Sequence, residues 1–444
     1  MKSHRREFIK KTALGTAGLT IGGMGLSAAS YRRIVGANDT VVFAAVGVNS
    51  RGLANIQAVL GCRGTAISHI CDVDSRATGK SIEEVSKING SKPAGITDIR
   101  KLLENKSLDA ITVATPDHWH AHMAIMAVQA GKHVYLEKPS SHNIAENEIL
   151  VKVYRQTGKL IQMGNQQRSA PTSIEAIERI IKGDIGRPYF GKAWYANRRG
   201  PIGVGKIIPV PDWLDWDLWQ GPAPRTDYRD NIVHYNWHWF WRWGTGELLN
   251  NATHEVDICR WALGVDYPDK VSAMGGRLHF KDDDWEFCDT QVVNYQYGDD
   301  KLITWEGKSC NGMKEYNMDR GALIQGTEGS FVLHRNGYEM YDLAGKLIEN
   351  KEETGKSETT GTRGSGSLDV LHMYNFLEGI RNGTRLNAPV DDGAVSVNLC
   401  HLGNISQRLG RMLTIDTSTG KIIKDNEAKA LMHRVYEDGW ELSG

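Results

Sequence analysis

The chain has 444 residues, of which 40% are hydrophobic and 24% charged, a composition typical of soluble globular proteins and long enough for two or three domains. Its 53 basic and 53 acidic residues give a formal net charge of +0, so charge favours neither nucleic acid nor an anionic membrane as a partner. The six cysteines are scattered and form no CxxC pair, which indicates buried thiols rather than a disulfide framework, a zinc site or a redox dithiol.

The first 30 residues (1–30) have the organisation of an export signal. Arg5 and Arg6 precede an apolar, glycine-rich stretch that ends in small residues around Ala28 and Ala29. This pattern resembles a twin-arginine signal peptide and predicts a periplasmic mature protein. The apolar stretch is too short and glycine-rich for a confident membrane span, so we expect none in the mature form. The alternative is a chance arginine pair before a disordered tail.

Residues 40–164 alternate between short apolar strand patterns and helical patterns. Strand patterns such as TVVFAAVG and SLDAITVAT are each followed by a segment with helical spacing. This alternation predicts an α/β Rossmann domain, a parallel sheet covered on both faces, with ligands at the carboxyl ends of its strands. Longer strands and tight turns then predict a second domain over residues 165–435, of the α+β class with a large, mostly antiparallel open sheet.

A glycine-containing turn follows the first predicted strand. Gly47, Asn49 and Gly52 occupy the glycine positions of GxGxxG, and Ser50 and Arg51 lie between them. The turn opens a helix, where backbone N–H groups can bind a pyrophosphate. Asparagine in place of the middle glycine weakens the motif, because its side chain occupies space near the phosphates. A Rossmann-like fold without a cofactor is the alternative to a dinucleotide site.

The end of the second predicted strand supplies an acidic residue, Asp72. A carboxylate at this position can hold a ribose 2′-hydroxyl and would repel a 2′-phosphate. The sequence therefore predicts NAD rather than NADP as the cofactor, a preference that Arg76 nearby moderates.

The segment ATPDHWHAHMAIMAVQAGKHVYLEKP resembles the glucose–fructose oxidoreductase, inositol dehydrogenase and MocA family, and AGKHVYLEKP is its most specific part. The segments LDWDLWQGPAPRTDY and GTGELLNNATHEVDICRWALG resemble an exported bacterial branch of that family. The resemblance covers residues 40 to about 435. It implies an N-terminal Rossmann domain joined to a C-terminal open sheet.

The resemblance also implies roles for individual residues. Lys138 matches the lysine that meets the substrate and the nicotinamide ring, and Pro139 matches a proline that often follows a cis bond. His254 matches the catalytic histidine of the family. Most inositol-dehydrogenase-like members have an aspartate four residues earlier, where this chain has Asn250. An amide can hydrogen-bond a hydroxyl but cannot accept its proton at neutral pH, so Lys138 and His254 must divide the proton chemistry.

Oxidation of a secondary alcohol needs a base for the hydroxyl proton and a donor that polarises the oxygen. His254 is the expected base, with a core histidine as the alternative, and Lys138 is the expected donor, with a surface pair to Glu137 as the alternative. Asp257 either orients His254 or is a structural acceptor. Further cofactor contacts are expected from Thr115, Pro116, His118, His120, Glu137 and Gln166. Substrate contacts are expected from Arg168, Tyr195, Arg198 and Trp239. The alternation in HWFWRW predicts that its tryptophans line one face of a strand, a face that suits a core as well as a sugar.

These features predict an NAD-dependent oxidoreductase acting on a ring hydroxyl of a sugar or glycoside, at carbon 3, with tightly bound NAD that is recycled in place. One alternative is a glycosidase or lyase of the same fold that uses transient oxidation and needs an additional base. A second is a non-catalytic sugar-binding protein. We expect a small carbohydrate as partner and no nucleic acid, no metal site, and by family analogy a homo-oligomer, either a dimer or a tetramer.

Overall fold

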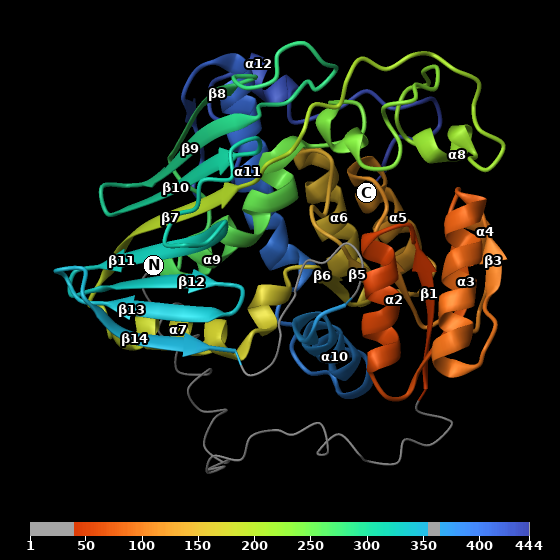
Figure 1. Cartoon of the computed structure of the whole chain (residues 1–444), viewed down its shortest axis with the longest axis horizontal. Coiled ribbons are helices and arrows are strands. Elements are labelled where there is room, and N and C mark those ends of the chain that lie inside the picture. The colour runs from red at the N-terminus through yellow and green to blue at the C-terminus, as the bar shows by residue number, and fades with distance from the viewer. Residues whose placement is uncertain (1–39, 354–364, 444) are drawn as a thin grey trace. The chain divides into compact units, whose positions relative to one another are not determined.

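The computed structural model describes residues 40–353 and 365–443, so the export signal expected in residues 1–30 lies outside the described residues (Figure 1). In the described ranges, none of the helices is long and apolar enough to cross a membrane. Two sheets organise this part of the chain.

The first sheet is parallel, with six strands in the order β3-β2-β1-β4-β5-β6. Its strands are β1 (Val41–Val46), β2 (Thr65–Cys71), β3 (Ala94–Ile96), β4 (Ala110–Val113), β5 (His133–Leu136) and β6 (Ile161–Met163). The connecting helices are α2 (Arg51–Gly61), α3 (Ser75–Asn89), α4 (Ile99–Leu102), α5 (Asp117–Gln129) and α6 (Ile144–Thr157). Strand order reverses between β1 and β4, the place where open parallel sheets bind ligands. The Rossmann prediction is confirmed.

A helix from late in the chain, α10 (Ser367–Asn382), completes this domain. Its side chains Met373, Phe376 and Leu377 share one buried core with Phe43 of β1. Part of the segment predicted as C-terminal domain therefore covers the N-terminal sheet, which sequence order does not indicate.

The second sheet has nine strands in the order β14-β13-β12-β11-β7-β10-β9-β8-β15. They are β7 (Pro188–Ala196), β8 (Lys270–Gly276), β9 (Thr290–Tyr297), β10 (Lys301–Lys308), β11 (Arg320–Gly326), β12 (Ser330–His334), β13 (Gly337–Tyr341), β14 (Leu347–Glu352) and β15 (Leu413–Thr414). Only the β7–β10 pair is parallel among these strands, so the mostly antiparallel prediction is confirmed.

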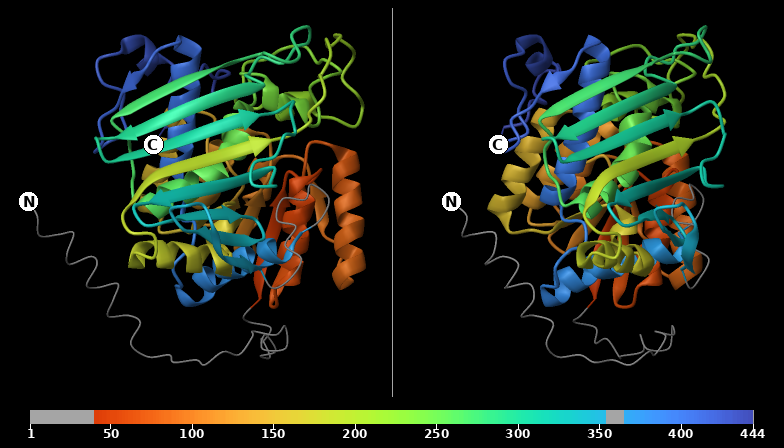
Figure 2. Two further views of the ribbon diagram at one scale, coloured as in Figure 1. Left: turned by 60° about the vertical axis from the view of Figure 1, so that its left-hand side comes forward. Right: turned by 90° about the vertical axis from the view of Figure 1, so that its left-hand side faces the viewer.

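Helices pack on one side of this sheet, as Figure 2 shows. They include α7 (Pro171–Lys182), α9 (Thr253–Leu263) and α11 (Val390–Leu409), with the short 3-10 helix η3 (Gln166–Ser169) and α12 (Asn426–Ala430) near them. A π-helical turn, η5 (Leu248–Ala252), leads directly into α9. Asn250 lies in this π-turn, and π-turns occur often at functional sites.

The aromatic segment, which we define as residues 197–243, runs from the end of β7 and returns before η5. It contains α8 (Trp216–Gln220) and the 3-10 helix η4 (Asn236–Trp239). The segment contacts the N-terminal domain through its backbone: Ser75 N–H donates to the Trp213 carbonyl at 2.9 Å and Asp215 N–H donates to the Val73 carbonyl at 3.0 Å. It thus lies beside the loop that follows β2.

Candidate functional site

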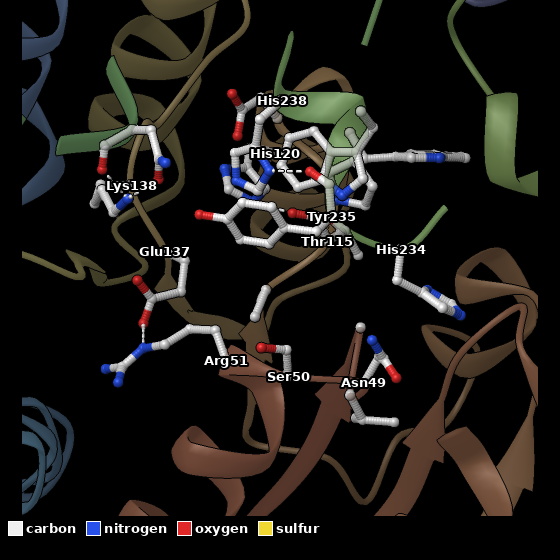
Figure 3. A pocket seen from close by; sticks show the side chains of 18 of the residues that line it. Asn49, Ser50, Arg51, Thr115, His120, Glu137, Lys138, His234, Tyr235 and His238 are labelled. Carbon is white, nitrogen blue, oxygen red and sulfur yellow. Dashed lines mark hydrogen bonds and ion pairs between the residues drawn. The ribbon is translucent and has the colours of Figure 1, made fainter. Parts of the chain in front are cut away.

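A cavity of about 570 Å3 lies at the carboxyl end of the parallel sheet. Residues of the turns after β1, β2, β4 and β5 line it together with the aromatic segment, η5, α9 and the second sheet. Figure 3 shows part of this lining, with Asn49, Ser50 and Arg51 at one side and Lys138, Tyr235 and His238 at another. Both domains therefore contribute to one site.

The turn after β1 is shaped for close backbone approach. Gly47 has φ +73°, and a Cβ atom there would lie 2.7 Å from the Thr115 side chain. A Cβ on Gly52 would lie 1.8 Å from the Gly47 carbonyl oxygen, so Gly52 is a packing glycine under the turn and does not itself line the cavity. The N-terminus of α2 opens at this turn, and Asn49, Ser50 and Arg51 line the cavity there. Such a turn fits the pyrophosphate of a dinucleotide.

Asp72 lines the cavity at the end of β2, as the sequence predicts. One of its carboxylate oxygens accepts from Val48 N–H at 2.7 Å and the other from Asp74 N–H at 2.9 Å. Burial raises the pKa of Asp72, and this effect outweighs the two backbone hydrogen bonds, which favour the ionised carboxylate. Arg76 is bound to Asp74 and stacks over Trp213, 3.3 Å from the ring centroid, so it faces the aromatic segment. The carboxylate is thus positioned for a ribose hydroxyl, while the nearby cation is engaged elsewhere.

Glu137 pairs with Arg51 rather than forming a surface pair with Lys138. Arg51 Nε lies 2.8 Å from the Glu137 carboxylate (Figure 3). The Nη2 atom of Arg51 lies 2.5 Å from Asp369 of α10. Burial opposes ionisation of Glu137, but Arg51 keeps its pKa below the usual value. Gln166 lies beside this pair and lines the cavity. The network ties the nucleotide turn to the end of β5.

Lys138 follows β5 and precedes a cis peptide bond to Pro139, in agreement with the family pattern. Its Nζ donates to the carbonyl oxygen of Asn250 and, at 3.1 Å, to the Asn250 side-chain oxygen. Burial lowers the pKa of Lys138 to about 8, against the opposing effect of nearby carboxylates. His120 lies between the Pro139 carbonyl at 2.6 Å and the Thr115 carbonyl at 2.8 Å and so positions this turn. An amine with this pKa can exchange a proton near neutral pH.

His254 lies one helical turn after Asn250, and both line the cavity. Burial lowers the pKa of His254 well below 6.5, and the cations Arg320 and Lys138 lower it further. The imidazole is therefore neutral at physiological pH and can accept a hydrogen bond. The geometry brings together Lys138, Asn250 and His254, as expected.

Two other predicted site residues form an ion pair outside the cavity lining. Arg168 Nε and Nη2 lie 2.6 and 2.8 Å from the carboxylate oxygens of Asp257, and both side chains are buried. Asp257 also accepts from Ser396 at 2.6 Å. Of the two roles left open for Asp257, the structure shows the structural acceptor, and the expected contact of Arg168 with substrate is corrected because the pair joins η3 to α9.

Three further expectations are corrected by burial or position. His118 is fully buried, and its ring nitrogens face the carbonyls of Trp219 at 3.0 Å and Trp243 at 3.3 Å. Trp239 is 1% exposed and stacks on Trp285 with 4.0 Å between ring centroids, because η4 replaces the expected strand. Arg198 is exposed and does not line the cavity, whereas Tyr195 does. His118, Trp239 and Arg198 therefore do not line the cavity.

The sequence analysis did not identify Asp117 as a site residue. Asp117 begins α5, lines the cavity and accepts from Thr245 Oγ1 at 2.5 Å. Burial raises its pKa to about 7, although the Thr245 hydrogen bond and Lys138 favour the carboxylate. Its position in the turn between β4 and α5, in the motif TPDH, was the available signal.

The aromatic segment also contributes site residues that were not expected. His238 Nδ1 faces the Tyr235 carbonyl oxygen at 2.6 Å, which leaves Nε2 as the acceptor of a neutral ring. Burial lowers the pKa of His238 to about 3. The ring stacks on Trp237 with 3.6 Å between centroids, and all three residues line the cavity. Within residues 40–353 and 365–443, no group of three or more His, Cys, Asp or Glu residues could hold a metal ion.

Comparison with protein families identifies both domains. Residues 41–165 match an oxidoreductase family with an NAD-binding Rossmann fold, and residues 174–332 match the GFO/IDH/MocA C-terminal domain. The chain is 24% identical over 441 residues to a glycosyl hydrolase family 109 protein of Shewanella baltica, covering 88% of this chain and 90% of the relative. It is 27% identical over 423 residues to an alpha-N-acetylgalactosaminidase of Tannerella forsythia, covering 86% and 89%.

Solved structures share the fold. The WlbA dehydrogenase from Bordetella pertussis, in complex with NADH and UDP-GlcNAcA, superposes with a TM-score of 0.62 at 19% identity, covering 85% of this chain and 99% of that one. The aldose-aldose oxidoreductase from Caulobacter crescentus superposes with a TM-score of 0.62 at 17% identity, covering 85% and 100%. These structures share the fold, and the match of residues 41–165 to the NAD-binding family assigns the cofactor-binding domain to the NAD type.

Proposed function

This chain is built from the NAD-binding and C-terminal domains of the Gfo/Idh/MocA oxidoreductase family, and we propose that it oxidises a ring hydroxyl of a sugar or glycoside to a keto-sugar. The observation that carries the proposal is the position of Lys138. Lys138 lines the same cavity as His254 and the turn after β1. Its amine donates hydrogen bonds to the backbone and side-chain oxygen atoms of Asn250. Bound NAD+ would supply the electron-pair acceptor for the oxidation.

The proton chemistry falls to Lys138 and His254. An amine whose pKa is about 8 is partly neutral near pH 7, so it can take the hydroxyl proton. The neutral His254 ring can accept a hydrogen bond from the same or the adjacent hydroxyl. Asn250 holds the Lys138 amine by two oxygen atoms and thereby orients its lone pair when the amine is neutral. We place the oxidation at the carbon-3 hydroxyl of the ring, which gives a keto-sugar.

We also propose that NAD stays bound between turnovers. The aromatic segment supports this because it is fastened to the loop after β2 next to Asp72. Leu214 forms a bridge with Asp74, and His234 Nε2 lies 2.7 Å from the Asp74 carboxylate. A second sugar would then reoxidise the cofactor in place, which suits export to the periplasm, itself a proposal that follows from Arg5 and Arg6.

The experiment for this proposal uses purified protein and a panel of methyl hexosides. We expect nucleotide to be released on denaturation, and a methyl hexoside to reduce the bound nicotinamide without cleavage of the glycosidic bond. Lys138→Ala should abolish reduction while the protein stays folded. Protein that releases no nucleotide, or that keeps its activity after Lys138→Ala, would contradict the proposal.

A second candidate function is a redox-assisted glycosidase, in which oxidation acidifies a neighbouring C–H and allows elimination. Relatives named alpha-N-acetylgalactosaminidase favour it. This reaction needs an additional base, and Asp117, which lines the cavity and has a pKa of about 7, is the available group. Release of methanol from a methyl hexoside with no net reduction of nicotinamide would favour this reaction over net oxidation.

A further inference from the structure

The aromatic segment contributes the His238 side chain to the cavity, where it is partly buried (Figure 3). The imidazole stacks on the Trp237 ring, with 3.6 Å between the ring centroids and 17° between the ring planes. The Tyr235 ring also lies against it, with 4.5 Å between the centroids. These aromatic contacts hold the plane of the His238 ring in place before any ligand binds.

A backbone contact determines which nitrogen of His238 carries the proton. Nδ1 lies 2.6 Å from the carbonyl oxygen of Tyr235, and a carbonyl oxygen can only accept, so the N–H is at Nδ1. Burial lowers the pKa of His238 to about 3, and the cations Lys138 and Arg199 lower it further, although the Tyr235 hydrogen bond opposes them. The ring is therefore neutral, and Nε2 has a lone pair that accepts hydrogen bonds but is too weakly basic to take a proton near neutral pH.

The Nε2 atom of His238 has no hydrogen-bond partner within residues 40–353 and 365–443. A lone pair at the wall of a cavity recognises a ligand through a hydrogen-bond donor. A protonated amine is disfavoured as that donor, because the charges of Lys138 and Arg199 already act on the His238 ring and would repel it. A hydroxyl is a neutral donor, and the substrate of the proposed reaction has several.

We infer that Nε2 of His238 accepts a hydrogen bond from a second hydroxyl of the sugar, while Lys138 acts on the hydroxyl that is oxidised. The inference rests on the proposed function and names a residue that orients its substrate. Two contacts at two hydroxyls fix the rotation of a sugar ring in the cavity, whereas one contact does not. A sugar that lacks the second hydroxyl would leave Nε2 without a partner, which lowers its affinity for the site.

The test is a double-mutant cycle between His238 and single hydroxyls of the substrate. The kcat/KM of the purified holoenzyme is measured for the methyl hexoside that it uses best and for the 2-deoxy, 4-deoxy and 6-deoxy forms of that glycoside. For one deoxy form we expect the wild type to lose about tenfold to a hundredfold in kcat/KM. His238→Asn keeps an amide N–H for the Tyr235 carbonyl but removes the acceptor at Nε2. This variant should therefore use that deoxy form and the parent glycoside nearly equally.

The comparison of the same two glycosides in each protein cancels the effect of the missing hydroxyl on intrinsic reactivity. His279→Asn, at an exposed histidine outside the cavity lining, is the matched control and should leave every ratio at its wild-type value. If His238→Asn does not fold, His238→Phe, which can keep the stacking on Trp237, replaces it under the same criteria.

Two results would overturn the inference. One is a wild type that uses all three deoxy forms as well as the parent glycoside, and the other is a loss for each deoxy form that stays the same in the His238 variant. If no glycoside is oxidised, the proposed function fails, and calorimetric titration of the same glycosides then decides the inference separately. A loss of affinity for one deoxy form that disappears in His238→Asn would support it, and equal affinities or no binding would refute it.

Discussion

Replacing Asn250 by aspartate places a carboxylate against the Lys138 amine. In the structure the Asn250 side-chain oxygen lies 3.1 Å from Lys138 Nζ. Opposite unit charges about 3 Å apart attract by about 1.4 kcal/mol in water and about 5 kcal/mol at an effective dielectric of about 20. Because one pKa unit corresponds to about 1.4 kcal/mol, Asn250→Asp should raise the Lys138 pKa by roughly 1 to 4 units.

This shift has a measurable effect if the neutral Lys138 amine accepts the substrate proton. With a pKa of about 8, half of the amine is neutral at pH 8. In Asn250→Asp the neutral fraction at that pH falls to roughly a tenth or less. The acid limb of the kcat/KM profile should therefore move to higher pH by at least about one unit, and activity at pH 8 should fall about fivefold or more.

The assay is the pH dependence of kcat/KM for glycoside oxidation, with Asn250→Leu as the control. The leucine removes the side-chain hydrogen bond without adding charge, so burial should keep the Lys138 pKa low and the acid limb should not move to higher pH. Activity of Asn250→Asp that is equal or higher than wild type at pH 6–7 would refute the reasoning. It would mean that the introduced carboxylate, and not the lysine, takes the proton.

Three further predictions concern the cofactor turn and stability. Gly47→Ala should lower the free energy of unfolding by about 1–3 kcal/mol, because Gly47 has φ +73° and the new Cβ would lie 2.7 Å from the Thr115 side chain. It should also lower the amount of nucleotide recovered from the purified protein. Recovery equal to that of the wild type would contradict the binding of the pyrophosphate at this turn. Arg168→Met should lower the free energy of unfolding in urea by about 1.5–3 kcal/mol, since it removes both charged hydrogen bonds to buried Asp257 and leaves only Arg260 at 3.7 Å and Ser396 beside it, whereas Arg168→Met with Asp257→Leu should cost less. Buried histidines such as His118 and His142 have a pKa well below 6.5, so below that pH the unfolded chain binds more protons. The free energy of unfolding should then fall with decreasing pH by about 1.4 kcal/mol per unit for each such histidine, and a flat profile between pH 5 and 6.5 would contradict their burial as neutral rings.

The residues at the ends of parallel strands were predictable from the sequence. Asp72 directly follows β2 and Lys138 lies two residues after the end of β5, and the carboxyl ends of parallel strands meet at one edge of the sheet. Position after a strand also places Asp117 in the cavity, although its raised pKa depends on burial and could not be inferred from the sequence.

Contacts between distant segments were not predictable. Arg168 and Asp257 are 89 residues apart, and only the packing of η3 against α9 brings them together. A histidine and an aspartate three residues apart on one helix suggest a pair, but Asp257 faces Arg168 and His254 faces the cavity. Alternation in HWFWRW suggested a strand, yet η4 buries Trp239, because tertiary stacking on Trp285 outweighs local pattern.

Arg335 shows the same limit for the second domain. It lies in a turn between two strands, where a solvated charge is the usual expectation. Its place in the cavity follows from the length of β12 and β13 and from how the second sheet meets the N-terminal domain, which no local pattern encodes.

The most direct test of the central claim is a single-turnover reaction of the purified protein with a methyl glycoside and no added nucleotide or acceptor. We predict that bound nicotinamide becomes reduced, that a keto-glycoside forms in equal amount with its methyl group still attached, and that Lys138→Ala does neither. Protein that contains NAD but forms no reduced nicotinamide and no keto-glycoside with any methyl hexoside of the panel would contradict the claim.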